Sequence, residues 1–369
     1  MTRASPARRR RRRLLVSLAL VLALGALAWP WIDRHVRAAR ILAGVGAGDP
    51  VEGVRERDLT LAGLPARRYA TGGGPPVLLV HGVHPAGIDE PRLVRFARLL
   101  ADAGFVVVTP ALPALRELRF DAASADRIGR TAGALAQLEG ADAVGIVGIS
   151  FGGGLALVAA ADPAHRDAIA AVWAIGPHHD ARRLCRWWRG EAIAGPDGER
   201  PAVTPERYGA QVLAYAYAED YFDDQVPRAR RALRAALDGD GARTDRLAAE
   251  LAPPVRAQLA RIRHGGDLDA AAPRLAEVAE AHAAELAAVS PAGRLADARA
   301  EVFLLHGRDD PVVAATESRW IAAELPAEAR GGLVVTDLIR HAETHALADL
   351  STQWAVIHLV AGALGALDR

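Results

Sequence analysis

A five-residue motif, Gly148-Ile149-Ser150-Phe151-Gly152, directly follows the apolar run 143–147. The run predicts a buried strand, and the motif predicts a sharp turn from that strand into a helix. Glycines on both sides of the serine permit a strained backbone that a side chain would obstruct. The turn would expose the Ser150 hydroxyl and leave the N–H of Phe151 at the helix start. The alternative is a serine that only caps the next helix.

Carboxylates and histidines follow two later apolar runs. Asp309 and Asp310 come shortly after the run 302–305, and His341 and His345 come after the next run. Serine, carboxylate and histidine therefore each follow a predicted strand, in that chain order. In a mostly parallel sheet the carboxyl ends of the strands lie at one edge, which favours a shared site.

Together these motifs resemble those of the α/β-hydrolase fold, from about residue 55 to the C-terminus. Residues 77–82 resemble the strand and oxyanion loop of that family, and 104–110 resemble its next strand. His306-Gly307 with Asp310 resembles its acid turn. The combination is more specific than any one motif.

The resemblance implies a catalytic triad and an oxyanion hole. Ser150 would be the nucleophile, Asp310 the acid that orients the base, and His341 the base. The oxyanion donors would be the backbone N–H groups of Phe151 and Val83.

Each role has an alternative in the sequence. Asp309 is adjacent to the preferred acid and would point elsewhere, while Asp180 is a fallback acid after the strand that follows the elbow helix. His345 is the alternative base. His81 is expected to brace its loop, and His84 faces either the pocket or solvent.

Apolar runs alternate with helical patterns over most of the chain, which predicts a mostly parallel central sheet with helices on both faces. About 125 residues separate the strand near 175 from the strand near 301, more than one crossover helix needs, and their helical spacing predicts a cap over the site. The predicted division is a basic tail with a transmembrane anchor (1–35), a linker or packed helix (36–55), an α/β-hydrolase core (56–178 and 300–369) and a helical cap insertion (179–299).

The N-terminal segment predicts a membrane anchor. Residues 14–32 carry no charge and follow six arginines at 8–13. A helix of this length crosses about 30 Å of hydrocarbon. The arginines predict a cytoplasmic N-terminus and an extracytoplasmic catalytic domain. A cleaved signal peptide is the alternative, since Ala26-Leu27-Ala28 fits a cleavage site, in which case the protein is secreted.

Composition excludes several function classes. A net charge of +1 argues against a nucleic-acid partner, and the absence of lysine excludes Schiff-base and P-loop chemistry. The pairs His81 with His84 and His178 with His179 lack further ligands at metal-site spacing, so we expect no metal and no cofactor.

The predicted function is a membrane-tethered serine hydrolase that cleaves a small-molecule acyl substrate, a carboxylic ester or related compound, through an acyl-enzyme. An acyltransferase of the same fold and a non-catalytic membrane-anchored binding module are the alternatives.

Overall fold

The computed structural model describes residues 6–47, 51–201, 203–263, 265–340, 343–344 and 349–369, with side chains from residue 25 onward except at 340 and 343–344. Within this part, one sheet is built from β1 (Arg55–Leu61), β2 (Leu64–Ala70), β3 (Pro76–Val80), β4 (Val106–Pro110), β5 (Val144–Ile149), β6 (Ile169–Ile175), β7 (Glu301–Gly307) and β8 (Arg330–Thr336). The strand order is β1-β2-β4-β3-β5-β6-β7-β8, and only the pairs β1–β2 and β2–β4 are antiparallel. The predicted mostly parallel central sheet is confirmed.

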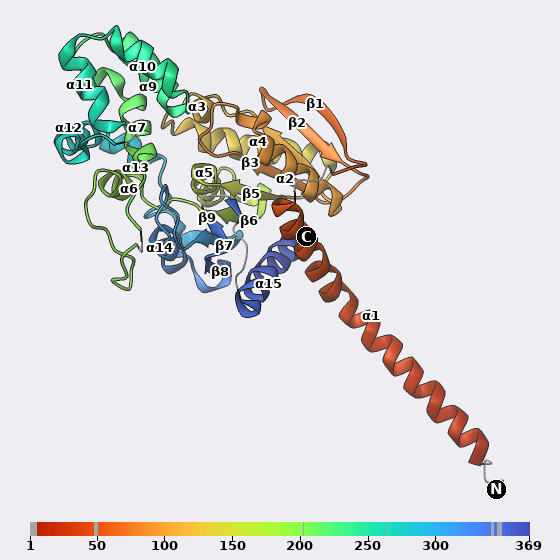
Figure 1. Ribbon diagram of the computed structural model, residues 1–369. Helices are drawn as coiled ribbons and strands as arrows, with labels where there is room; N and C mark the ends of the chain where they lie inside the picture. The colour runs from red at the N-terminus through yellow and green to blue at the C-terminus, as the bar shows by residue number, and fades with distance from the viewer. Residues whose placement is uncertain (1–5, 48–50, 202, 264, 341–342, 345–348) are drawn as a thin grey trace.

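Helices cover both faces of the sheet because alternate residues of its buried strands point to opposite sides. On one face, α2 (Pro91–Asp102), α15 (Leu350–Leu367) and the end of α1 (Pro6–Gly46) pack on residues such as Leu79 and Trp173. On the other face, α4 (Ala123–Glu139) and α5 (Phe151–Ala161) pack on residues such as Leu78 and Val172. The layers are visible in Figure 1.

Helix α1 extends from the body, and only its C-terminal part packs against α2 and α15 (Figure 1). The contact with α2 is close, since a Cβ at Gly44 would collide with Leu99. The guanidinium of Arg95 donates to the Gly44 carbonyl at 2.8 Å. Residues 36–46, expected as linker or packed helix, form a packed helix.

Helices also fill the long interval between β6 and β7. They are α6 (Ala181–Trp188), α7 (Arg207–Ala216), α8 (Ala218–Tyr221), α9 (Val226–Leu237), α10 (Gly241–Ala249), α11 (Pro253–Ile262), α12 (Leu268–Ala281) and α13 (Ala283–Ala288). In Figure 1 they lie together at the end of the body away from α1. We call this group the cap. Its aromatic side chains are mostly buried within it, as Trp187, Tyr221 and Phe222 show.

Among the described side chains, α15 is the one helix long and apolar enough to span a membrane. It lies against β6, β7, β8 and α1, and its inner face belongs to the core. Side chains 14–24 of the predicted anchor lie outside the described part. The remaining elements are α3 (Pro113–Arg116), α14 (Thr316–Glu324), β9 (Ile339–Arg340), β10 (Glu343–Thr344) and the short 3₁₀ turns Gly87–Asp89, Arg166–Ala168, Leu295–Asp297 and Ala327–Ala329.

Candidate active site

Ser150 sits at the turn from β5 into α5 with a strained backbone, φ 52° and ψ −127°. A residue other than glycine rarely adopts a positive φ, and such backbone strain concentrates at functional sites. Its two flanking glycines explain how the turn forms. A Cβ at Gly148 would lie 2.6 Å from the Cα of Gly153, and one at Gly152 would collide with the His81 carbonyl. The sequence motif therefore folds into the predicted elbow.

The loop after β3 passes directly beside the serine. A Cβ at Gly82 would lie 3.2 Å from the Cβ of Ser150, closer than most side-chain contacts, so glycine favours this approach. His81 holds the loop: its Nδ1–H donates to the Gly82 carbonyl at 2.7 Å, and its Nε2 accepts the Leu112 N–H at 3.2 Å. Burial lowers the pKa of His81 to about 4, so the ring is neutral. His81 therefore braces the loop, as its predicted structural role requires.

The hydrogen bond from His81 also orients the peptide group between Gly82 and Val83. A trans peptide directs its C=O and N–H to opposite sides, so holding the Gly82 carbonyl fixes the direction of the Val83 N–H. The Tyr208 hydroxyl of α7 donates to the Val83 carbonyl at 3.2 Å. Phe151 is the first residue of α5, where a backbone N–H has no intrahelical acceptor. Val83 and Ser150 line one cavity, and Phe151 directly follows Ser150 in the chain.

Asp310 is buried just after β7. Its Oδ1 accepts the N–H groups of Val312 at 2.8 Å and Val313 at 2.9 Å. A Cβ at Gly176 would lie 3.5 Å from the Asp310 Oδ2, which places the carboxylate beside the loop that follows β6. Asp309 is exposed, as expected for the neighbour that points elsewhere.

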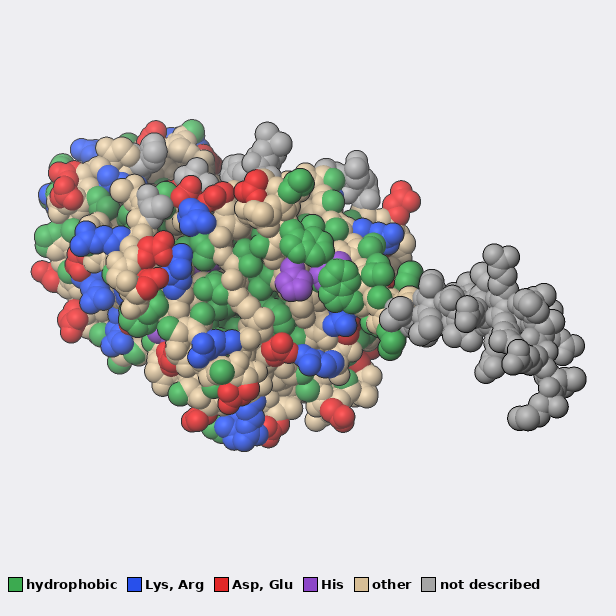
Figure 2. Space-filling model, turned by 90° about the horizontal axis from the view of Figure 1, so that it is seen from below, with side chains coloured by type: hydrophobic (Ala, Val, Ile, Leu, Met, Phe, Trp, Pro, Cys, Tyr) green, Lys and Arg blue, Asp and Glu red, His purple; other side chains and the backbone are tan. Residues whose placement is uncertain are grey.

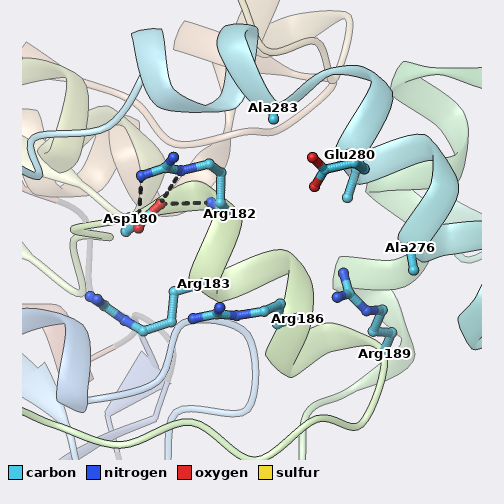
Figure 3. A pocket seen from close by; sticks show the side chains of 9 residues that line it. Asp180, Arg182, Arg183, Arg186, Arg189, Ala276, Glu280 and Ala283 are labelled. Carbon is cyan, nitrogen blue, oxygen red and sulfur yellow. Dashed lines mark hydrogen bonds and ion pairs between the residues drawn. The ribbon is translucent and has the colours of Figure 1, made fainter.

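The fallback acid, Asp180, lies elsewhere. Its carboxylate caps the start of α6 by accepting the Arg182 N–H at 2.9 Å, and the Arg182 side chain also bonds it. It lines a separate cavity between α6 and the helices α12 and α13, where Arg183, Arg186 and Arg189 also lie (Figure 3). Ser150 is not among the residues that line this second cavity.

Both candidate bases, His341 and His345, lie outside the described residues. The strand β9 leads to His341 and pairs with β10, a short hairpin that the sequence did not predict. Ile339, two residues before His341, lines the same cavity as Ser150. The choice between the two histidines stays a prediction.

The paired histidines are engaged in hydrogen bonds. His84 lines the cavity of Ser150, and its Nδ1 accepts the Ala86 N–H at 3.2 Å. His178 donates from Nε2 to the Val289 carbonyl at 2.9 Å and stacks on Phe151 with ring centroids 4.0 Å apart. His179 bonds Glu324 at 2.6 Å. Within the described part of the chain, no group of three or more His, Cys, Asp or Glu residues could hold a metal ion.

The cavity at Ser150 has a volume of about 710 Å³ and two chemically different walls. One wall, which we call the α1 wall, consists of apolar residues from the core face that α1 and α2 cover. The other, the cap wall, includes the polar or charged residues Glu206, Tyr208 and Asp238. The α1 wall contains Ile41, Leu42, Val45, Leu93, Phe96, Ile149, Trp173, Ile175, Leu305 and Ile339.

Two sets of lining residues were missed by sequence reasoning. Ile41, Leu42 and Val45 lie in the segment interpreted as a linker or packed helix, and their spacing is that of one helix face. Tyr208 had no distinguishing signal, because its partner on the oxyanion loop is 125 residues away.

No protein-family model matches the chain, and no curated protein matches it. Similar solved structures include a membrane phospholipase A described as a bacterial virulence factor (21% identity, 88% of this chain and 90% of that chain, TM-score 0.43). Others are a hormone-sensitive lipase from a metagenome library (16%, 82% and 81%, TM-score 0.43) and an α/β-hydrolase fold protein from Nakamurella multipartita (18%, 84% and 100%, TM-score 0.40).

Proposed function

We propose that this protein is a serine hydrolase that cleaves a carboxylic ester, or a related acyl compound, through an acyl-enzyme. The observation that carries the proposal is the strained Ser150 at the elbow, facing a cavity beside a loop held by His81. A serine kept at positive φ, with glycine required on both sides, is costly to a fold unless its position is used.

In the proposed reaction, the Ser150 Oγ attacks the acyl carbon while His341 takes the hydroxyl proton. The oxygen of the acyl carbonyl becomes negative and accepts hydrogen bonds from the N–H groups of Phe151 and Val83. The bond to the leaving alcohol then breaks, and the histidine returns the proton to that alcohol. Water, deprotonated by the same histidine, attacks the acyl carbon, the bond to the Ser150 oxygen breaks, and the histidine returns the proton to that oxygen as the acid leaves.

Asp310 supports this reaction by holding the imidazole in the required tautomer and stabilising it when charged. Its Oδ1 is held by two backbone N–H groups, which fix the carboxylate in place. Trp188 of the cap donates to the Val312 carbonyl at 2.7 Å, which ties the acid turn to the cap.

Labelling with a fluorophosphonate probe tests the proposal. The wild-type protein should react, and Ser150→Ala should not react while it keeps its fold by circular dichroism. Hydrolysis of p-nitrophenyl acetate should fall in Ser150→Ala by several orders of magnitude. An unreactive wild-type protein would favour a binding module, and transfer of the acyl group to an added alcohol in preference to water would favour an acyltransferase.

We further propose that residues 14–32 anchor the protein in a membrane, with the catalytic domain outside the cytoplasm. Exposed large apolar residues support this, because most of them gather on α1 and on the start of α15. Figure 2 shows apolar and histidine side chains together on this face. The exposed large apolar residues on α1 and at the start of α15 are Leu27, Trp29, Trp31, Ile32, Val36, Leu350 and Trp354.

The aromatic members of this face are suited to a membrane interface, where Trp residues are enriched. The rings of Trp31 and Trp354 lie 6.2 Å apart, with His35 stacked on Trp354 at 5.4 Å. His35 and His358 also bond each other at 3.1 Å. These contacts join the end of the proposed anchor to the body.

Fractionation of cells tests the anchor. The full-length protein should remain with membranes after a high-salt wash and be accessible to protease from the extracytoplasmic side. Recovery of a soluble protein whose N-terminus is Trp29 would support the signal-peptide alternative instead.

A further inference from the structure

The α1 wall of the cavity is built in part by the helix that we propose as the membrane anchor. Leu42 and Val45 are half-buried and line the cavity, and Ile41 is buried beside them. Their positions, i, i+1 and i+4, place them on adjoining parts of one helix surface. Leu93 and Phe96 of α2 continue this surface.

The residues of this wall are all apolar, and the charged residues Glu90 and Arg92 line the cavity beside it. Ile175 and Leu305, at the carboxyl ends of β6 and β7, extend the apolar surface to Ser150. Nearby on α2, Glu90 caps the helix by accepting the Leu93 N–H at 2.8 Å and pairs with Arg92 at 2.8 Å. The charges at this edge are therefore engaged with each other. An apolar concave surface next to a reactive group is suited to an apolar part of a ligand.

The wall is fixed in place before any ligand arrives. Arg37 of α1 forms a two-pronged ion pair with Asp368 after α15, at 2.9 and 3.0 Å, and lies 4.8 Å over the Phe105 ring. At the end of α1, Arg95 bonds the Gly44 carbonyl. A preformed surface loses little freedom when it binds a flexible chain.

The same helix face reaches from the cavity to the exposed aromatic residues. Trp31, Ala38, Leu42 and Val45 are separated by 7, 4 and 3 residues, the spacing of a single helix face. At 1.5 Å per residue, Leu42 lies about 16 Å along the axis from Trp31. Pocket wall and proposed interface anchor are therefore two parts of one rigid helix.

We infer that the α1 wall binds the long acyl chain of an ester drawn from the lipid phase, with the ester carbonyl at Ser150. The inference rests on the proposed serine hydrolysis and adds the substrate class and the element that selects it. The leaving alcohol then lies toward the cap wall, where Glu206, Tyr208 and Asp238 provide polar groups.

The test compares p-nitrophenyl palmitate with p-nitrophenyl acetate in the full-length protein, under the same detergent conditions. Leu42→Trp fills the α1 wall with an apolar side chain. The ratio of kcat/KM for palmitate to kcat/KM for acetate should fall at least about tenfold, since a filled pocket rejects the longer chain. Leu42→Asp, which adds a charge without filling the space, should lower the same ratio.

Two matched variants locate the effect. Ala43→Trp places the same side chain on the exposed side of α1, and both activities should match those of the wild type. Leu237→Trp fills the cap wall, and the ratio should stay within about twofold of the wild-type value.

An unchanged ratio in both Leu42 variants, or a fall in Leu237→Trp instead, would overturn the inference. The proposed function fails differently, since the wild-type protein would then hydrolyse neither ester.

Discussion

The two walls of the cavity differ in origin as well as in chemistry. The α1 wall is apolar. Its residues come mainly from β5, β6 and β7, from α2, and from α1, which precedes the first strand of the sheet. The cap wall comes from α7, α9 and the loop before α7, and it carries polar groups. The sequence predicts a cap over the site and a membrane anchor in the N-terminal segment. In the structure α1 also lines the cavity, so our two proposals assign attachment and substrate choice to the same helix.

The two walls meet at Ser150. The largest expected effects come from the catalytic groups, because these act on every ester, whichever wall binds it. His341→Ala should remove activity toward short and long esters alike, almost as completely as Ser150→Ala, because nucleophile and base act as a unit. His345→Ala should change the rate about tenfold at most, through a small shift of the base. The measurement is kcat/KM for p-nitrophenyl acetate and palmitate.

The opposite pattern would assign the base to His345. An inactive His345→Ala with an active His341→Ala would mean that the hairpin β9–β10 carries the chain four residues further before the base is reached.

Asp310→Asn should have the next largest effect, a loss of about 10⁴ in kcat, because an amide favours the wrong tautomer of the histidine. Asp180→Asn is the matched control. Its carboxylate caps α6 and lines the other cavity, and asparagine caps a helix about as well as aspartate, so activity and stability should both stay close to those of the wild type. Equal losses in both variants would contradict the assignment of the acid.

Much of the fold could be predicted from local pattern. The apolar runs at 77–80 and 302–305 lie within β3 and β7, and the elbow motif fixed the position of Ser150. Sterics explain this success, since the glycines at 148 and 152 leave the chain few conformations.

The packing of α1 could not be predicted in the same way. Its contacts with α15 join residues more than 300 positions apart, such as Arg37 with Asp368. No local periodicity reports which face of a helix a distant segment will cover. The same limit applies to Tyr208, whose contact with Val83 depends on how the whole cap folds.

A pH series tests the buried histidine that packs between the elbow helix α5 and the end of the cap. His178 is buried between Phe151 and the end of the cap, and burial lowers its pKa to about 4. The unfolded chain has a histidine pKa of about 6.5, so between these values the unfolded state binds more protons. The contribution of neutral His178 is therefore complete above about pH 6.5 and decreases as the pH falls toward 4.

His178→Phe should lower the slope of unfolding free energy against pH by about 1.4 kcal/mol per unit between pH 6 and 4.5. Urea unfolding followed by tryptophan fluorescence measures this slope. Other titrating groups, His81 among them, are present in both proteins, so the difference isolates His178. Parallel slopes would mean that His178 titrates in the folded protein as it does when unfolded.

The smallest expected effect tests the cap wall itself. Tyr208→Phe removes the hydrogen bond to the Val83 carbonyl, and loss of one such bond costs about 1 kcal/mol. Burial raises the pKa of Tyr208 to about 12, so the hydroxyl is neutral and donates at any working pH. Because Val83 is the proposed oxyanion donor, kcat should fall about fivefold for acetate and palmitate equally.

Tyr215→Phe is the control on the same helix, since Tyr215 does not line the cavity, and its kcat should match that of the wild type. The ratio between the two esters separates the walls. Leu42→Trp should change this ratio, whereas Tyr208→Phe should leave it unchanged and lower both rates. If Tyr208→Phe reduced palmitate hydrolysis alone, the cap wall would hold the acyl chain, and the division of labour between the walls would be reversed.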